Sequence, residues 1–189
     1  MTQQGAARLH LPQPNHHIEA RFLDRELCDA LVQEIDARPA VAAGVHRRGD
    51  KYVDDSVRRA SAVLLSPERR ADLEARWLEL GKRVAAQFSC TVTSAGDSHA
   101  VRYAPGDFFA PHRDQSEKQR FDGVSPRVLS IVVFLNEGFG GGILKLYEGN
   151  ECIAVPAATG DLVAFPSDLM HEVSPITSGD RYTLVSWLY

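Results

Sequence analysis

The chain has 189 residues, and 21 Lys and Arg against 25 Asp and Glu give it a formal net charge of −4. This length predicts one compact domain with a sizeable core. The mildly acidic balance argues against a protein that binds nucleic acid through a broad basic face. The longest apolar run, residues 131–135, is far too short to span a bilayer, so we expect no membrane-spanning segment.

Cysteine usage and the N-terminal sequence indicate the compartment. Cys28, Cys90 and Cys152 lie far apart and form no CxxC pair. Residues 1–17 are polar and lack the apolar stretch of a secretory signal. An odd, scattered set of cysteines in a chain without an export signal is typical of reduced thiols. We therefore predict a cytoplasmic protein.

The N-terminal half predicts two helices and a charged loop, preceded by a loose arm or edge strand over residues 1–17. Apolar residues recur at three- and four-residue steps over residues 21–38, which indicates a helix that Asp24 caps. Residues 44–59 are dense in charges and turn formers, so we expect an exposed loop or hairpin. Ser66 and Pro67 supply a cap and a first-turn proline for a second helix with one apolar face.

After residue 88 the pattern changes to short β-branched and aromatic runs between turn signals. Many short strands at close spacing predict an all-β sandwich or barrel, with the two helices packed on one outer face. The expected strands cover residues 91–93, 99–103, 128–135, 143–147, 152–155, 162–165 and 182–188.

The candidate metal ligands are His112, Asp114 and the later His171. On a strand, residues i and i+2 point to the same face, so His112 and Asp114 would converge. Two histidines and one carboxylate form the facial triad that holds non-haem Fe(II) and leaves positions open for substrate and O2. Taken alone, His-x-Asp is a weak signal, because a solvated or core histidine is the commoner case.

Arg181 follows His171 across a loop rich in turn formers. If that loop joins two antiparallel strands, the guanidinium returns near the metal and offers a two-pronged bond to a carboxylate. 2-Oxoglutarate needs both features, because its keto-acid end chelates iron and its distal carboxylate requires a fixed cation. The alternative is a surface arginine in a hairpin.

Several motifs occur in a fixed order in the C-terminal half. They are Tyr-x-Pro-Gly…His-x-Asp at residues 103–114, Phe-Leu-Asn at 134–136, Gly-Gly-Ile-Leu-Lys-Leu at 141–146, Gly-Asp-Leu-Val-Ala-Phe at 160–165, His-Glu-Val at 171–173, Gly-Asp-Arg at 179–181 and Trp187. Together they make the sequence from about residue 101 resemble the prolyl-4-hydroxylase-like branch of the Fe(II)/2-oxoglutarate dioxygenases. The nucleic-acid dealkylating branch carries a second arginine soon after the first, and none follows Arg181. We therefore expect no nucleic-acid substrate.

The resemblance implies a mainly β fold with flanking α-helices and a double-stranded β-helix (jelly-roll, cupin-like) core. Residues 1–189 would form a single domain, with a helical support region at 1–89 and the β-helix core at 90–189. His112, Asp114 and His171 would hold the iron, and Arg181 would bind the distal carboxylate of 2-oxoglutarate. The residues implied to line the co-substrate pocket are Tyr103, Phe134, Leu144 and Thr183.

The implied reaction is oxidative decarboxylation of 2-oxoglutarate to succinate and CO2, coupled to hydroxylation of a C–H bond. It requires Fe(II), 2-oxoglutarate and O2, with ascorbate as the candidate reductant. The arginines of residues 44–59 are most simply part of a solvated loop. The alternative is that this loop folds over the substrate, with Arg47, Arg48, Arg58 and Arg113 as the candidate substrate contacts.

The first expectation for the substrate is a prolyl residue in a protein, because the Gly-Gly-Ile-Leu-Lys-Leu segment and the charged loop are similar to those of protein prolyl hydroxylases. A free amino acid or small metabolite is the close alternative. Two further alternatives are a non-catalytic metal-binding jelly-roll module and a cupin-like enzyme without a co-substrate, which would not need Arg181. The oligomeric state is left open.

Overall fold

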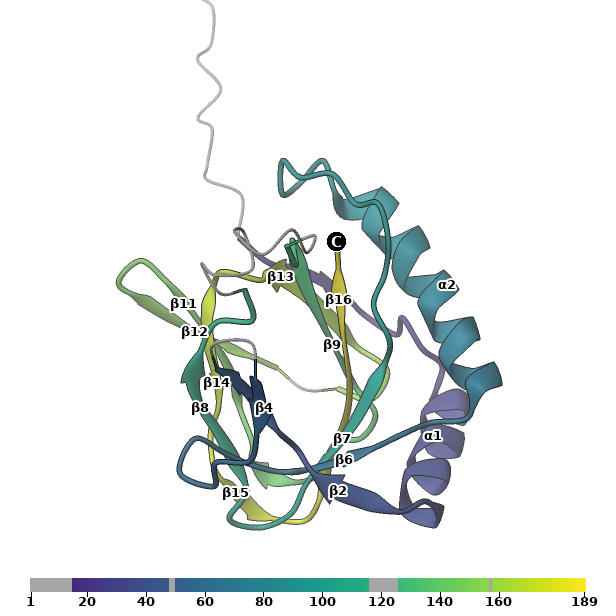
Figure 1. The fold of residues 1–189 in the computed structure, drawn as a ribbon, viewed down its shortest axis with the longest axis vertical. Coiled ribbons are helices and arrows are strands. Elements are labelled where there is room, and N and C mark those ends of the chain that lie inside the picture. Colours follow the sequence, from purple (N-terminus) through teal and green to yellow (C-terminus); the bar gives the residue numbers. More distant parts are fainter. Residues whose placement is uncertain (1–14, 48–49, 116–125, 157) are drawn as a thin grey trace, which may run out of the picture.

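The computed structural model describes residues 15–47, 50–115, 126–156 and 158–189 (Figure 1). Two antiparallel sheets face each other as the walls of a β sandwich. The first wall is a seven-stranded sheet with the order β1 (His17–Glu19), β13 (Leu162–Pro166), β9 (Leu129–Phe134), β16 (Arg181–Leu188), β7 (His99–Tyr103), β6 (Ser61–Val63) and β2 (Ala40–Ala42). The second wall is a five-stranded sheet with the order β12 (Glu151–Val155), β11 (Leu144–Glu148), β14 (Met170–Val173), β8 (Phe108–His112) and β5 (Arg58–Arg59).

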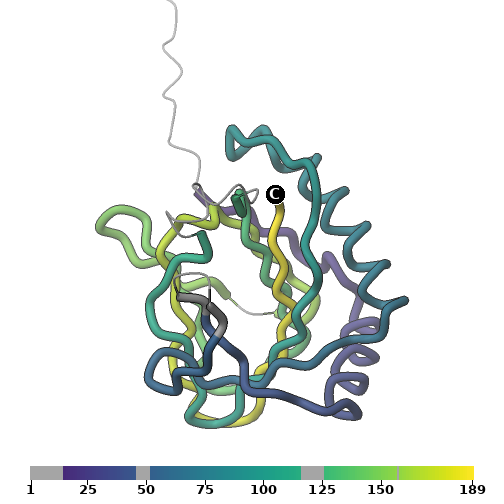
Figure 2. Tube along the Cα trace, in the orientation of Figure 1, coloured from purple at the N-terminus to yellow at the C-terminus, as the bar shows by residue number. Residues whose placement is uncertain are grey.

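Two short two-stranded sheets complete the sheet structure. β10 (Gly140–Gly141) pairs with β15 (Ile176–Ser178), and β3 (Val45–Arg47) pairs with β4 (Asp50–Tyr52). Every strand pairing is antiparallel. The first wall combines strands from both parts of the chain: β1 and β2 come from the N-terminal part and β16 from the C-terminal end, drawn purple to blue and yellow in Figure 2.

The two helices lie on the outer face of the seven-stranded sheet, as predicted (Figure 1). Helix α1 (Arg25–Ala37) begins after Asp24, whose carboxylate accepts a hydrogen bond of 2.7 Å from the Leu27 amide. Helix α2 (Pro67–Val84) begins after Ser66, as the cap and first-turn proline indicated. Within the described residues, neither helix is long and apolar enough to cross a membrane.

Strand β9 shows how the core divides into two layers. All six of its residues are buried, because helices cover one face of the sheet and the second sheet covers the other. Leu129, Ile131 and Val133 pack with the helices. Val132 and Phe134 point the other way, into the core between the sheets. The candidate site lies in that inner core.

The structure departs from the sequence predictions in several places. Residues 91–93 form no strand; instead, the Thr93 amide donates a hydrogen bond of 2.6 Å to the carbonyl of Tyr189. Residues 1–89, expected to supply helices and a loop, also supply β1, β2 and β6 to the first sheet and β5 to the second. The expected loop at 44–59 contains the β3–β4 hairpin and β5. Residues 1–14 of the predicted arm lie outside the described residues.

Candidate metal and co-substrate site

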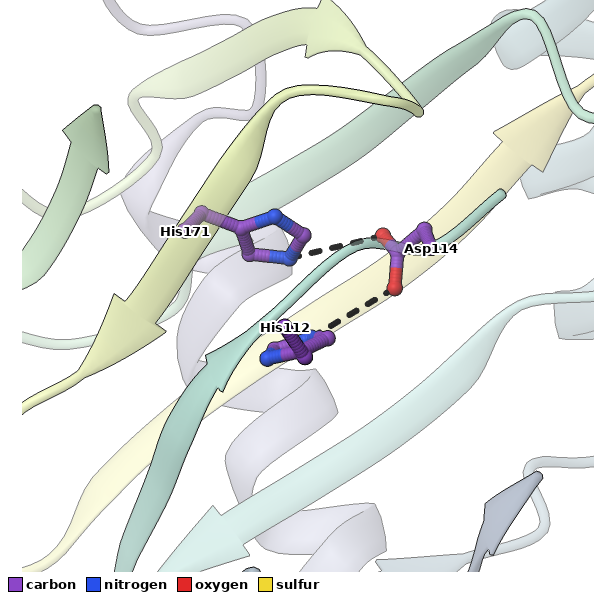
Figure 3. A group of neighbouring side chains, drawn as sticks. All are labelled: His112, Asp114 and His171. Carbon is purple, nitrogen blue, oxygen red and sulfur yellow. Dashed lines mark ion pairs between the residues drawn. The ribbon is translucent and has the colours of Figure 1, made fainter. Parts of the chain in front are cut away.

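His112, Asp114 and His171 come together between the two walls (Figure 3). One ligand atom from each lies within 4.8 Å of the others. His112 Nε2 is 3.5 Å from Asp114 Oδ1, and His171 Nε2 is 3.6 Å from Asp114 Oδ2. The carboxylate thus faces both imidazoles, which is the donor set of the facial triad.

A β-bulge in β8 helps to aim His112. His112 pairs with His171 and Phe109 pairs with Val173, so Ala110 and Pro111 together oppose the single residue between those partners. The extra residue turns His112 and Phe109 to the same face, where their rings stack with centroids 3.5 Å apart. The strict two-residue alternation that the sequence predicted does not hold in this strand.

Asp114 lies beyond the end of β8, which ends at His112. The expectation that both residues share one strand is therefore wrong, and other contacts position the carboxylate. The Ser130 hydroxyl donates a hydrogen bond of 2.7 Å to Asp114 Oδ2. Arg127 Nη1 donates to the Asp114 carbonyl at 3.3 Å, and the Gln115 amide donates to the carbonyl of Ser167 at 2.8 Å.

Backbone carbonyls orient both imidazole rings. His112 Nδ1 lies 2.9 Å from the carbonyl oxygen of Ala110, and His171 Nδ1 lies 2.9 Å from that of Leu169. A carbonyl oxygen only accepts, so in each ring Nδ1 carries the proton. The lone pair of each Nε2 is then directed at the centre of the site, as metal-binding histidines require.

The electrostatics favour the ligand forms of two of these residues. Burial lowers the pKa of His171, which keeps this imidazole neutral. Burial alone would raise the pKa of the Asp114 carboxyl. His171, His112 and the hydrogen bond from Ser130 outweigh that effect and hold the pKa of Asp114 well below its usual range. An ionised carboxylate and a neutral imidazole are the states that bind a divalent cation.

Arg181 lies in the same inner core and is buried, with 1% of its surface exposed. Its guanidinium carbon lies 5.2 Å from the ring centre of Tyr103 and 5.3 Å from that of Phe134. Nη1 donates to Thr183 Oγ1 at 3.5 Å, but Nε and Nη2 have no partner among the described residues. Burial lowers the pKa of Arg181 to about 10, so it is still charged at neutral pH.

The other residues expected around the co-substrate surround this guanidinium or lie in the same inner core. Tyr103 pairs with Arg181 across β7 and β16, and Phe134 pairs with Thr183 across β9 and β16. Leu144 lies on β11 of the opposite wall and is buried with Phe134 and Tyr103 in the inner core. Tyr103, Phe134, Leu144 and Thr183 thus lie with Arg181 in one inner core.

The four arginines expected to contact the substrate differ in their positions. Arg58 lies 4.5 Å from the ring centre of Phe109 and donates to the Gly44 carbonyl at 3.2 Å. Arg113 donates to the carbonyl of Asp168. Arg47 belongs to β3, but its side chain, like the whole of Arg48, lies outside the described residues. The ring of Phe109 thus lies between Arg58 and His112, whereas Arg113 links its own loop to the loop that contains Asp168.

The sequence predictions missed the residues that support the ligands, which are Phe109, Arg127, Ser130 and Ser167. Ser130 had a readable signal, because it is the polar residue in the otherwise apolar run of β9. Arg127 had none, since its stacking on Trp187 at 3.7 Å depends on the tertiary fold.

Comparison with known proteins agrees with this geometry. Residues 98–189 match the model of the 2OG-Fe(II) oxygenase superfamily. Residues 98–189 therefore belong to this superfamily. A PKHD-type hydroxylase of Shewanella oneidensis is 36% identical over 95 residues, and one of Phenylobacterium zucineum is 35% identical over 92. Each alignment covers 46% of this chain and 40% of the relative, so the chain spans less than half the length of these curated relatives.

Solved structures share the fold over nearly the whole chain. A prolyl-4-hydroxylase from Pseudomonas putida is 25% identical, covers 92% of this chain and 91% of its own, and superposes with a TM-score of 0.73. A prolyl hydroxylase from Trichoplax adhaerens, solved with a hypoxia inducible factor peptide, is 19% identical, covers 93% and 83% of the two chains, and has a TM-score of 0.76. The predicted jelly-roll core and the prolyl-4-hydroxylase-like branch are thus confirmed.

Proposed function

We propose that the protein is an Fe(II)- and 2-oxoglutarate-dependent hydroxylase that acts on a prolyl residue of a protein. The observation that carries the proposal is the buried Arg181 guanidinium, in the same inner core as His112, Asp114 and His171, with two nitrogen atoms that have no partner in the described part of the chain. A buried, unpaired charge is costly, and a bound carboxylate would remove that cost. A metal-binding module without a co-substrate has no use for this cation.

His112, Asp114 and His171 would hold the iron. Two neutral imidazole nitrogens and one ionised carboxylate suit Fe(II), and three protein ligands leave coordination positions open. The Nδ1 bonds to the Ala110 and Leu169 carbonyls keep each Nε2 available as the ligand atom. Phe109 stacks on His112 and limits rotation of this imidazole.

Arg181 would bind the distal carboxylate of 2-oxoglutarate through its free Nε and Nη2 atoms. Tyr103, Phe134, Leu144 and Thr183 would line the pocket and exclude water from this ion pair. Phe134 has no hydroxyl, so the polar contacts on this side come from Arg181, Thr183 and the Tyr103 hydroxyl. When bound, iron and 2-oxoglutarate would supply the oxidising chemistry together with O2: one oxygen atom would enter succinate as CO2 is lost, and the other would hydroxylate a C–H bond of the substrate.

The substrate proposal rests on the similarity to the Pseudomonas putida prolyl-4-hydroxylase, which extends over 92% of this chain at 25% identity. The residues proposed to contact the substrate are Arg47, Arg48, Arg58 and Arg113, with residues 44–59 closing over it. Arg58 is the strongest of these, because it lies over Phe109, which in turn stacks on His112. Ascorbate as a reductant and a cytoplasmic location remain predictions of the sequence.

The proposal is tested by measuring succinate formed from 2-oxoglutarate with Fe(II), O2 and ascorbate. Proline-containing peptides, free L-proline and a set of free amino acids are supplied in separate reactions. We expect a peptide to stimulate succinate formation and to gain the mass of one oxygen atom. If only a free amino acid stimulates succinate formation, the substrate is a small metabolite and not a protein. No succinate under any condition would contradict the proposed hydroxylase.

A further inference from the structure

Two buried serines lie behind the candidate metal ligands, and the proposed reaction does not explain them. Ser130 on β9 is 0% exposed, and Ser167, just after β13, is 1% exposed. By the alternation of β9, Ser130 points the same way as Val132 and Phe134, into the inner core. A hydroxyl at such a position is unfavourable unless it is hydrogen-bonded.

The two hydroxyls form a chain that ends on Asp114. Ser130 Oγ lies 2.7 Å from Asp114 Oδ2, and its distance to Ser167 Oγ is 3.0 Å. An ionised carboxylate only accepts, so Ser130 gives its single proton to Asp114. Ser167 must then be the donor in its contact with Ser130. The chain therefore runs from Ser167 through Ser130 to the carboxylate, and each bond polarises the next.

Asp114 needs this support because no strand fixes its direction. It lies in a bend two residues beyond the end of β8, and its side chain is turned toward the histidines by the contacts around it. Ser130 bonds one carboxylate oxygen, Oδ2. Oδ2 also lies 3.6 Å from His171 Nε2, so it has two neighbours, of which Ser130 is the hydrogen-bond donor. The other oxygen, Oδ1, faces His112 Nε2 at 3.5 Å and accepts no bond from Ser130.

We propose that Ser130 is a positioning residue that holds Oδ2 of Asp114 and leaves Oδ1 as the metal ligand, with Ser167 orienting the Ser130 hydroxyl. The inference rests on the proposed metal site and adds to it the reason why this carboxylate would bind through one oxygen. A carboxylate free to rotate could bind through both oxygens and occupy a position that the co-substrate or O2 requires. The competing explanation is that the serines only satisfy each other in the core.

The test uses Co(II) as a spectroscopic probe on the full-length protein stripped of metal. Affinity is measured by calorimetric titration, and the visible absorption bands of Co(II) report the number and type of its ligands. The variants are Ser130→Ala, Ser130→Thr and Ser167→Ala. The matched control is Ser186→Ala, which removes a fully buried serine hydroxyl from β16 that bonds the Gly96 carbonyl instead.

We expect Ser130→Ala to raise the Kd for Co(II) by about 10- to 100-fold, the range for residues that support metal ligands, and to change the visible spectrum. Ser130→Thr keeps the hydroxyl and should restore both affinity and spectrum. Ser167→Ala should raise the Kd less than Ser130→Ala, because it acts only through Ser130. Ser186→Ala should bind Co(II) as the parent does.

Parental affinity and spectrum in Ser130→Ala would overturn the inference while leaving the proposed metal site in place. If Ser130→Ala does not fold, unchanged Co(II) binding by Ser167→Ala would overturn it instead. A parent protein that binds no Co(II) would overturn the proposed metal site and this inference together. The two failures are therefore distinguishable.

Discussion

His112 on β8 lies directly opposite His171 on β14, with the centres of their rings 4.1 Å apart. Cross-strand partners are held at a fixed separation by the backbone hydrogen bonds of the sheet. Two of the three candidate ligands are therefore positioned by the fold itself. The direction of the third, Asp114, depends on side-chain contacts instead, chiefly the hydrogen bond from Ser130.

Replacing any one of His112, Asp114 and His171 by Ala should abolish iron-dependent succinate formation while the protein stays folded. Each residue supplies one of only three ligand atoms, so its loss removes the metal rather than the core. His99→Ala is the matched control, because His99 lies on β7 outside the site and contacts Trp187. Activity and thermal unfolding are measured on all four variants. Full turnover in any ligand variant would contradict the assignment.

Arg181→Ala should weaken 2-oxoglutarate binding and leave metal binding unchanged. A buried ionic group that loses its partner costs about 3–5 kcal/mol. The dissociation constant of 2-oxoglutarate should therefore rise by roughly 100-fold or more, since about 1.4 kcal/mol is tenfold. Arg181→Lys should recover part of the loss, because an ammonium pairs with a carboxylate without the two-pronged bond. If Arg181→Ala binds 2-oxoglutarate as tightly as the parent protein, a residue other than Arg181 binds the distal carboxylate.

Gly142→Ala should disturb the co-substrate pocket through Arg181. Gly142 has a φ of +59°, and a Cβ there would lie 2.9 Å from Arg181 Cδ and 2.3 Å from Ile176 Cδ1. Gly149 has a φ of +62° but open space around it, so Gly149→Ala carries the backbone cost alone. We expect Gly149→Ala to lose about 1–2 kcal/mol of stability with normal 2-oxoglutarate binding. Gly142→Ala should lose more stability and bind 2-oxoglutarate more weakly; equal behaviour of the two variants would count against a packed Arg181.

The thiols should differ sharply in reactivity. Burial raises the pKa of Cys28 from 9.0 to about 11, and the nearby Asp24 and Asp29 add to this. Cys152 is exposed. At pH 8, a disulfide reagent such as DTNB should modify Cys152 at once and Cys28 only after unfolding in guanidinium. Cys152→Ser should remove the fast phase; loss of that phase in Cys28→Ala would contradict the burial of Cys28.

The same shift predicts a pH dependence of stability. The folded protein keeps the Cys28 proton up to pH about 11, whereas the unfolded thiol loses it above pH about 9. The unfolded state therefore releases this proton first, and the free energy of unfolding should fall as pH rises from about 9 to 11. Denaturant titrations of the parent and Cys28→Ala across this range measure the contribution. A steeper fall in Cys28→Ala than in the parent would contradict it.

The sequence predicted the parts of the fold that local pattern determines. The caps Asp24 and Ser66 begin the two helices, and the apolar run of β9 is buried on both faces. It did not predict the short strands β2, β5 and β6, each of two or three residues, and it offered an edge strand near β1 only as an alternative to a loose arm. Such strands carry too few residues for an alternation signal, and only pairing with distant strands such as β7 and β13 defines them.

The candidate site likewise has features that the sequence predicts and features that only the tertiary fold reveals. Residue type and order were sufficient to select the triad, which the structure brings together, and Arg181, which the structure buries against Tyr103 and Phe134. The bulge in β8 and the position of Asp114 beyond that strand were not readable, because both depend on how β8 pairs with β14. Ser167 contacts Ser130 and Gln115 across several intervening strands, and Arg127 stacks on the distant Trp187, so no local pattern reveals these contacts.

One inner core should hold both Fe(II) and 2-oxoglutarate, and anaerobic titration measures the two together. Fe(II) is added to the metal-free protein without O2, followed by 2-oxoglutarate, while visible absorption is recorded. We expect a weak charge-transfer band that needs both additions, is missing in His171→Ala, and requires far more 2-oxoglutarate in Arg181→Ala. If the parent protein shows no such band at saturating iron and 2-oxoglutarate, the proposed site is wrong.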